Sequence, residues 1–216
     1  MKCAAAPDQR RIETGRARRE KTKSRLLEAA ARLVAETGDA ATTIETLITE
    51  AGLSRGTFYN YWPSRDALLD ELWVVIGHDP FVSIQTSLAD VTDPAERIAT
   101  MARQAVLRAN SDKVWGWLVV AIADRDPPQT HELFSFPEPD IQAGLFSNRF
   151  SAKNLSSATD VVVGATLSAM KRALRQGVEE NYTSAVAAAI LCSLGVPPKE
   201  ATRIAQVEIP PVTASG

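Results

Sequence analysis

Two short stretches of helical periodicity, separated by one glycine, constrain the fold of this chain more than any other feature. The first stretch has four apolar residues at helical spacing, Ile44, Leu47, Ile48 and Ala51. Gly52 then interrupts the pattern with a residue that tolerates positive φ. Ser54 is placed to cap a second helix over 55–61, and Pro63 ends it. We therefore predict two short helices joined by a tight turn.

A longer helix is predicted in front of this pair, over 21–37. Its apolar residues share one face: Leu26, Ala30, Leu33 and Val34. Thr42 and Glu45 have the spacing of a capping box at the start of the next helix. Phe58 and Trp62 are four residues apart, so we predict that both pack back against the two preceding helices.

The rest of the chain also has helical periodicity, and no alternation typical of a strand persists. Ser64 can cap a fourth helix that runs to Gly77 or, kinked at Pro80, to Leu88. Four prolines predict a loop over 125–139. Further helices are predicted at 93–109, 113–124, 140–150, 157–176, 183–194 and 199–206. The predicted fold class is all-α, with a three-helix N-terminal domain before a larger helical domain.

The charge of the chain is unevenly distributed. Residues 1–65 carry 12 Lys and Arg against 8 Asp and Glu, and most of this basic excess lies in the first 25 residues. Residues 1–20 are polar, lack an apolar period and include Pro7 and Gly15, so we predict a flexible basic arm. Such an arm suits the phosphates of a nucleic acid. A merely solvated tail is the alternative.

Several classes of protein are disfavoured by what the sequence lacks. No signal-peptide core opens the chain, and the most apolar run, 184–196, is shorter than the roughly 20 residues that a membrane helix needs. Cys3 and Cys192 lack metal-ligand spacing. There are two histidines and no catalytic or phosphate-binding motif. We expect a cytoplasmic protein that is not an enzyme and holds no metal or cofactor.

The outer face of the second short helix carries the chemistry of the first third of the chain. Two short helices packed on a longer one can place the second helix in the major groove of DNA. Arg55 and Asn60 are predicted to read bases, because guanidinium suits guanine and an amide suits adenine. Gly56 would let the helix start approach a phosphate closely. The predicted DNA contacts are Thr43, Ser54, Arg55, Gly56, Thr57, Tyr59, Asn60, Tyr61 and Arg65.

Within that set, the predicted phosphate contacts are Thr43, Tyr59, Tyr61 and Arg65, whose side chains carry hydroxyl or guanidinium donors. A generic helical hairpin with a polar outer face is the alternative.

The helix predicted at 157–176 has two apolar faces. Val163, Leu167, Met170 and Leu174 lie on one side, which can cover the core of its own subunit. The opposite face has small residues that permit close approach of a second helix. Burial of both faces within one subunit is the alternative to a homodimer. The predicted dimer interface is Val161, Gly164, Ala165, Ser168 and Ala169.

Bulky, adaptable apolar side chains in the C-terminal part are candidates to line a cavity for an apolar ligand. Trp115 and Trp117 are two residues apart and cannot share one helix face, so at least one of them is expected to be ordinary packing. Core packing is the alternative for each candidate. The candidates are Met101, Trp115, Trp117, Leu118, Val119, Ile122, Phe134, Phe146 and Met170.

The stretch 25–73 resembles the DNA-binding region of the TetR family of one-component transcriptional regulators. The resemblance rests on LEAAARLVAETG at 27–38, Thr42-Thr43, AGLSRGTFYNY at 51–61 and SRDALL at 64–69. Three positions depart from the usual pattern: Ile48-Thr49 stands for Ile-Ala, Trp62 for Phe and Arg65 for Lys. Farther on, 140–150, 158–174 and 194–205 are similar to one C-terminal subgroup of that family.

The resemblance implies a helix-turn-helix DNA-binding domain over 21–66 and a ligand-binding and dimerisation domain over 67–208, with a flexible tail at 209–216. In the family, the last two long helices form a four-helix bundle between subunits. The implied function is that of a homodimeric repressor, which a small, largely apolar effector releases from a near-palindromic double-stranded DNA operator. A DNA-binding architectural or interaction protein without a small-molecule switch is the alternative.

Overall fold

The computed structural model describes residues 7–37, 42–123, 135–179 and 181–211, with side chains from residue 15 onward. Within these ranges every regular element is a helix, which confirms the predicted all-α class. None of the described helices is both long and apolar enough to cross a membrane. The chain divides into two compact units, residues 1–72 and 73–216.

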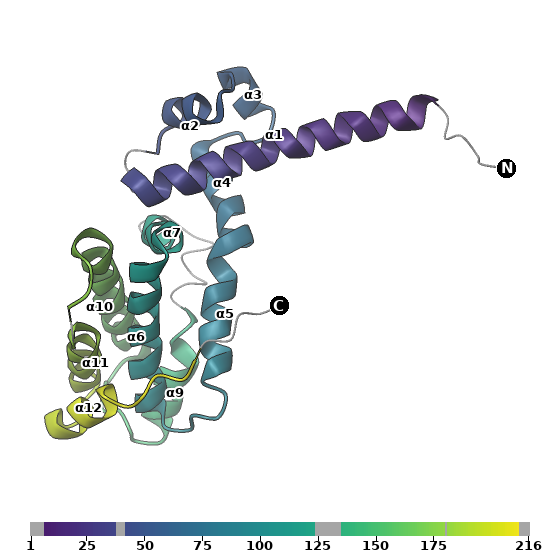
Figure 1. The fold of residues 1–216 in the computed structure, drawn as a ribbon. Helices are drawn as coiled ribbons and strands as arrows, with labels where there is room; N and C mark the ends of the chain where they lie inside the picture. The colour runs from purple at the N-terminus through teal and green to yellow at the C-terminus, as the bar shows by residue number, and fades with distance from the viewer. Residues whose placement is uncertain (1–6, 38–41, 124–134, 180, 212–216) are drawn as a thin grey trace. The chain divides into compact units, whose positions relative to one another are not determined.

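The first unit consists of four helices, α1 (Pro7–Thr37), α2 (Ile44–Ala51), α3 (Arg55–Tyr59) and α4 (Arg65–Leu72). α1 packs against α2 and α4, and α2 packs against α3 (Figure 1). Phe58 and Trp62 are buried, as predicted, with ring centroids 6.0 Å apart. They share the core with residues of the other three helices, among them Leu26, Ala30, Val34, Leu47, Leu68 and Leu69.

The start of α1 corrects the flexible arm predicted for residues 1–20. The helix begins at Pro7 rather than Lys21, so residues 7–20 are helical (Figure 1). Proline is tolerated in a first helical turn, because its missing N–H has no partner there in any case. The segment has five Arg and two Glu, which are strong helix formers, and the single Gly15 does not outweigh them.

The connection between α2 and α3 is a tight turn, as predicted from the position of Gly52. Gly52 has φ 61° and ψ 44°, a left-handed conformation, and its N–H bonds the carbonyl oxygen of Thr49 at 3.1 Å. The cap at the other end of α2 lies one residue later than predicted. Thr43 and Thr46 form the capping box, whereas Thr42 is buried and lies one residue before the N-cap.

The helix predicted to kink at Pro80 does extend to the region of Leu88, as three consecutive elements. α4 is followed by one π-helical segment, η1 (Trp73–Gly77), and then by α5 (His78–Ser87). Pro80 has no N–H to bond the carbonyl of Ile76, and its ring crowds that carbonyl. Ile76 lies in η1, which ends three residues before Pro80, and the widened turn of this segment relieves the conflict.

The second unit is built around α6 (Pro94–Ser111), whose buried side includes Ile98, Ala102 and Ala105. α6 contacts every other α-helix that the described residues of this unit form, and Figure 1 shows α10 and α11 beside it. Its alanines let these neighbours approach closely. The neighbours are α5, α7 (Lys113–Ala123), α9 (Glu138–Phe146), α10 (Leu155–Gln176), α11 (Tyr182–Ser193) and α12 (Pro198–Ala205).

Helix α9 begins and ends earlier than the predicted 140–150. It starts at Glu138 because Pro139 fits a first turn, so the predicted loop does not extend to residue 139. It ends at Phe146 because Asn148 takes a left-handed φ of 56°. The carbonyl oxygen of Gly144 then accepts from the backbone N–H groups of Arg149 and Phe150 at 2.7 and 3.0 Å, which closes the helix end.

Arg149, which follows α9, connects the start of α6 to α12 through two carboxylates. Its guanidinium bonds both oxygens of Asp93, each at 3.0 Å, and lies 2.9 Å from Glu200 of α12. Asp93 also caps α6 by accepting from the N–H of Ala95. The hydrogen bonds from Arg149 and then from Ala95 hold the pKa of Asp93 below its ordinary value, against the opposing effect of burial.

We predict that Arg149→Met lowers the free energy of unfolding by about 2 kcal/mol at neutral pH, because Asp93 and Glu200 lose a charged donor. The stability that comes from the lowered pKa of Asp93 is present above its ordinary value of about 4 and lost as pH falls through the lowered one. Below about pH 4, the stability of the variant should therefore fall less steeply.

Urea unfolding at a series of pH values measures both effects. Arg108→Met is the matched control, since it breaks the more exposed pair of Arg108 in α6 with Asp112, the C-cap of that helix, and should cost no more than about 0.5 kcal/mol. Equal pH slopes for the Arg149 variant and the wild-type chain would contradict the assignment.

Candidate nucleic-acid interface and apolar pocket

Helix α3 exposes a polar face to solvent and buries Phe58 on its opposite face. Phe58 is fully buried, whereas Arg55, Gly56, Tyr59 and Asn60 are exposed. Ser54 caps the helix, as predicted, by accepting from the N–H of Thr57 at 3.2 Å. A Cβ placed on Gly56 would have only the Ser54 hydroxyl within 4.0 Å. The start of α3 is therefore open to a large partner.

α3 is two residues shorter than the predicted 55–61. Asn60 is its C-cap and Tyr61 lies in the following turn, where backbone N–H groups bond carbonyls only three residues back. Pro63 makes this tightening necessary, because the residue before a proline disfavours helical geometry and the chain must leave the helix at Trp62.

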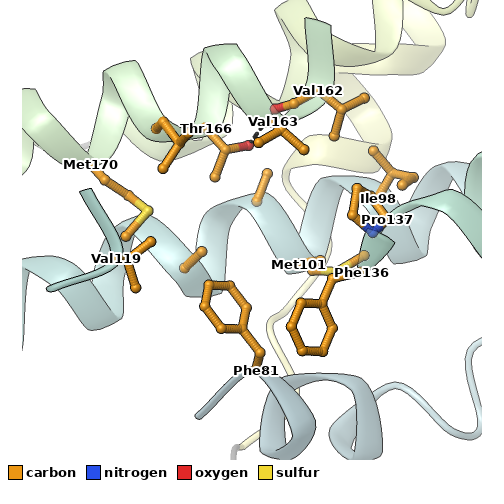
Figure 2. Close-up of a pocket in the computed structure, with 13 residues that line it drawn as sticks. Phe81, Ile98, Met101, Val119, Phe136, Pro137, Val162, Val163, Thr166 and Met170 are labelled. Atoms are coloured by element: carbon orange, nitrogen blue, oxygen red, sulfur yellow. Dashed lines mark hydrogen bonds between the residues drawn. The ribbon is translucent and has the colours of Figure 1, made fainter. Parts of the chain in front are cut away.

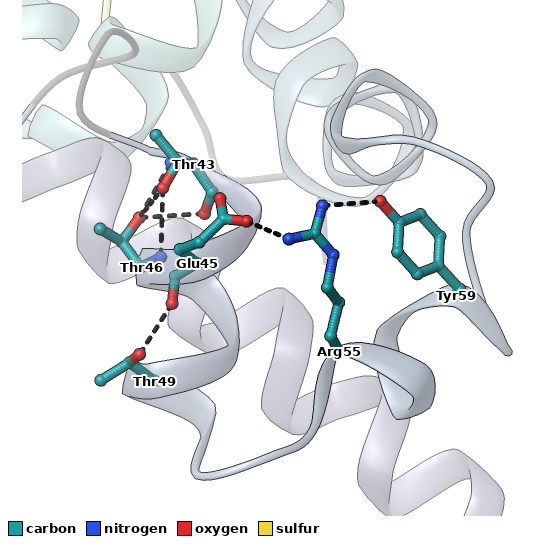
Figure 3. A network of polar contacts seen from close by, with 6 residues as sticks. All are labelled: Thr43, Glu45, Thr46, Thr49, Arg55 and Tyr59. Carbon is teal, nitrogen blue, oxygen red and sulfur yellow. Dashed lines mark hydrogen bonds and ion pairs between the residues drawn. The ribbon is translucent and has the colours of Figure 1, made fainter.

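The guanidinium of Arg55 lies between α2 and α3 at the exposed surface (Figure 3). Its Nη1 is 2.6 Å from Oε1 of Glu45, and its Nη2 is 3.5 Å from the Tyr59 hydroxyl. The Tyr59 hydrogen bond is the main cause that raises the pKa of Arg55, and the Glu45 carboxylate adds to it. Arg55, a permanent cation like other arginines, is held by neighbours on both helices.

A polar cleft separates the N-terminal half of α1 from α3, within the first unit. Arg19 closes one side of the cleft, because its Nη2 donates to the Asn60 carbonyl at 3.4 Å and its carbonyl accepts from the Tyr61 hydroxyl at 3.1 Å. Arg18 lies beside it and is exposed. The lining residues are Gly15, Arg18, Arg19, Thr22, Leu53, Thr57, Asn60 and Tyr61. Arg18 and Arg19, which were predicted to lie on a flexible arm, thus lie on helix α1 beside α3.

All four predicted phosphate contacts have polar atoms engaged within the protein, and for Tyr59 the partner of its hydroxyl is Arg55. Thr43 caps α2 through its hydroxyl, and the Tyr61 hydroxyl bonds Arg19. Arg65 donates from Nε to the Thr42 carbonyl at 2.5 Å and lies 3.5 Å from Asp66. These bonds fix helix ends and loops. A phosphate contact at any of the four remains a prediction.

An apolar pocket lies in the second unit between α5, α6, α7, α10 and the start of α9 (Figure 2). Its cavity volume is about 50 Å³, and the pocket is partly open to solvent. Phe81 and Phe136 stack in it with ring centroids 4.9 Å apart. Its lining side chains are Phe81, Ile98, Met101, Ala102, Ala105, Val119, Phe136, Pro137, Val162, Val163, Thr166, Leu167 and Met170.

Three of the residues predicted to line a cavity do so, namely Met101, Val119 and Met170. Phe146 was a wrong choice, since it is 92% exposed at the end of α9. Phe134 lies outside the described residues. Trp115, Leu118 and Ile122 are buried core, Trp115 donating to the Gly77 carbonyl at 3.0 Å, and Trp117 is half-buried with Arg175 over its ring. None of these four lines the pocket.

Several residues that line the pocket were not predicted from the sequence. Val163 and Leu167 had been assigned to the core face of their helix, which is correct, and the pocket opens onto that same face. Phe136 lay inside a segment predicted as loop, although its aromatic character next to Pro137 was visible. Thr166 is the single hydroxyl-bearing side chain of the lining, and it donates to the Val162 carbonyl at 2.7 Å.

Four of the five residues predicted at a dimer interface are exposed or half-buried on the outer face of α10, and their contact with a second copy stays a prediction. Val161, Gly164 and Ser168 are exposed and Ala165 is half-buried. Ala169 is 2% exposed in the single chain, so its assignment to the interface was wrong. Helical spacing explains the error, because Ala169 lies one residue past the stripe, which continues from Ser168 to the exposed Arg172 and Arg175.

Two family models match most of the chain. The N-terminal model for bacterial regulatory proteins of the tetR family matches residues 26–72, and the tetracyclin repressor-like C-terminal domain model matches residues 93–207. An uncharacterized HTH-type transcriptional regulator of Bacillus subtilis (strain 168), YerO, is 45% identical over 47 residues. That match spans 22% of this chain and only 16% of the length of that relative.

Solved structures resemble the chain over most of its length. The crystal structure of RolR in complex with the ligand resorcinol has a TM-score of 0.72 and 29% identity, covering 91% of this chain and 99% of that one. A putative tetR family regulator from Shewanella sp. PV-4 has a TM-score of 0.65 and 21% identity, covering 82% and 99%. The latter likeness bears on the fold alone.

We predict that Gly56→Ala separates stability from DNA binding. Alanine should stabilise α3 by about 0.5 to 1 kcal/mol, because the added Cβ has room. The same Cβ should lower DNA affinity by about tenfold or more, since it displaces a closely approaching phosphate. The measurements are thermal unfolding and binding to duplexes that the wild-type chain selects from a random pool.

Ser54→Ala serves as the contrasting variant, because loss of the cap should lower stability by about 1 kcal/mol and lower affinity through folding. A stabilised Gly56→Ala chain with unchanged affinity would show that no partner approaches α3 at this point.

Proposed function

Because the chain belongs to the TetR family of bacterial regulatory proteins, we propose that it is a DNA-binding transcriptional repressor that a small aromatic molecule releases from its operator. The observation that carries the proposal is the open polar face of α3, held at the surface by buried Phe58. A surface helix that exposes a guanidinium, an amide and hydroxyls offers the donors and acceptors that base edges and phosphates require. Acting on DNA, the protein would work in the cytoplasm.

The hydrogen bonds that each polar side chain already makes indicate whether it would read bases or contact phosphates. Arg55 has donors beyond those that face Glu45 and Tyr59, so it is suited to a guanine edge. The side chain of Asn60 lines the cleft beside Arg18 and is suited to adenine. Arg18 and Arg19 extend a basic surface from α3 along α1, where they can follow phosphates.

The effector class follows from the lining of the pocket in the second unit. Aromatic rings, two methionines and aliphatic side chains favour an apolar body, and none of the lining residues is charged. The stacked Phe81 and Phe136 provide faces for another ring. Thr166 has lone pairs left to accept a hydrogen bond from a phenolic hydroxyl. The likeness to RolR, whose structure holds resorcinol, supports a phenol-like effector.

A homodimer would couple the pocket to operator binding. Val162, Val163 and Thr166 of α10 line the pocket, while Val161, Gly164 and Ser168 of the same helix are exposed and suit a second copy. The two recognition helices of a dimer must meet half-sites about 34 to 36 Å apart, or a multiple of that spacing. A ligand that binds one arrangement of α10 better than another shifts the population away from the DNA-binding spacing.

The experiment begins with selection of duplexes from a random-sequence pool by the full chain, followed by release of the selected duplex with resorcinol. Resorcinol should release the wild-type chain, and benzoate should not, because no lining cation offsets its buried charge. Ala105→Leu fills the pocket, so we predict that it keeps operator affinity and raises the resorcinol midpoint by at least about tenfold.

Thr166→Val is the matched variant, since it removes the one lining hydroxyl at nearly constant volume and should weaken phenols more than toluene. Failure of the wild-type chain to select any sequence would contradict DNA recognition. Selection without release by any single-ring compound would favour an architectural DNA-binding protein over a sensor.

We predict that Gly164→Arg abolishes dimerisation and operator binding together. A Cβ at Gly164 meets nothing within 4 Å in the single chain, and arginine is a better helix former than glycine, so the fold should survive. At a two-fold interface the new charge would face its own copy without a partner. Sedimentation equilibrium and operator binding measure the two effects.

Thr202→Arg is the control, because it adds the same charge on an exposed face of α12 and should leave both properties unchanged. A monomeric Gly164→Arg chain with full operator affinity would refute the dimer as the DNA-binding species.

A further inference from the structure

Glu45 places a carboxylate on the face of the first unit that is proposed to meet DNA. Its side chain is 62% exposed, and its Oε1 lies 2.6 Å from Nη1 of Arg55. An acidic group that close to a phosphate backbone weakens binding by like-charge repulsion. Its presence beside the proposed base-reading arginine therefore suggests a role that offsets this repulsion.

The backbone around Glu45 is fixed from both ends of α2. Thr43 and Thr46 form the capping box at its start, and the Thr49 hydroxyl donates to the Glu45 carbonyl at 2.8 Å (Figure 3). Gly52 closes the other end in its left-handed turn. The carboxylate thus projects from a rigid element, whereas Arg55 projects from the first residue of α3 on a long side chain with many rotamers.

We propose that Glu45 is a positioning residue for sequence reading, which rests on the proposed operator binding: its carboxylate, with Tyr59, holds the guanidinium of Arg55 in the orientation that reads a base. Glu45 engages Nη1 and Tyr59 contacts Nη2. Arginine has five N–H donors, so three remain, and bidentate recognition of guanine O6 and N7 needs two. The pair is therefore compatible with base reading and reduces the side-chain freedom lost on binding.

The test compares the full chain with Glu45→Gln, Arg55→Ala and the double variant. Each is used to select duplexes from a random-sequence pool and is then titrated with duplexes that carry single base changes. Glu50→Gln is the matched control, because it removes the same charge from α2 at a carboxylate that pairs with Arg32 of α1 instead of α3. Circular dichroism checks that every variant is folded.

We expect Glu45→Gln to reduce base discrimination by about fivefold or more at the operator position where Arg55→Ala also loses it. In the Arg55→Ala background the change at Glu45 should have no further effect on discrimination, because the residue acts through Arg55. Glu50→Gln should leave the base preference unchanged.

Three results would overturn the proposal. An equal gain in affinity for all duplexes, also in the Arg55→Ala background, would mean that Glu45 only repels phosphates. A loss of discrimination that persists in that background would mean that Glu45 reads a base itself. An unchanged preference would mean that Arg55 needs no support. A wild-type chain that selects no sequence refutes operator binding instead, and so the two failures are distinguishable.

Discussion

The burial of Phe58 is the interaction on which the candidate DNA-binding face depends. α3 has five residues and α2 has eight, whereas isolated helices shorter than about 12 residues are marginal in water. Such helices persist because packing on a shared core replaces the missing helical cooperativity. Phe58 is fully buried, with Trp62 and Leu47 in the same core. Every polar side chain that α3 exposes is therefore positioned by an apolar residue on its opposite face.

Periodicity and breakers in the sequence were sufficient to predict most helices of both units. Gly52 and Ser54 acted where predicted, because a left-handed turn and a helix cap are local requirements of the backbone. The helical start of α1 was missed because the prediction required an apolar stripe, and residues 7–20 have none. Intrinsic propensity, rather than burial, was the relevant signal there.

The pocket could be predicted only in part, since it depends on which side chains several helices leave unfilled. Met101 and Met170 were recognisable as adaptable apolar residues, yet Phe146 looked equally suitable and is 92% exposed. Phe146 is the last residue of α9, and which face of α9 packs against α6 and α10 is set by tertiary contacts that spacing does not reveal. The engagement of Arg65 with the Thr42 carbonyl likewise depends on a contact between residues distant in sequence.

Helix α10 borders both the apolar pocket and the proposed dimer interface, so it is the element through which ligand binding and dimerisation would influence each other. Its inner face borders the pocket through Val162 and Thr166, and its outer face exposes Gly164 and Ser168, so both surfaces move with one rigid element. Close packing around α6 and the ion pairs of Arg149 with Asp93 and Glu200 resist gradual deformation of the second unit. In the proposed switch, a bound ring would act by favouring one position of α10 over another, and the strength of the switch would be limited by the difference in its affinity for those positions.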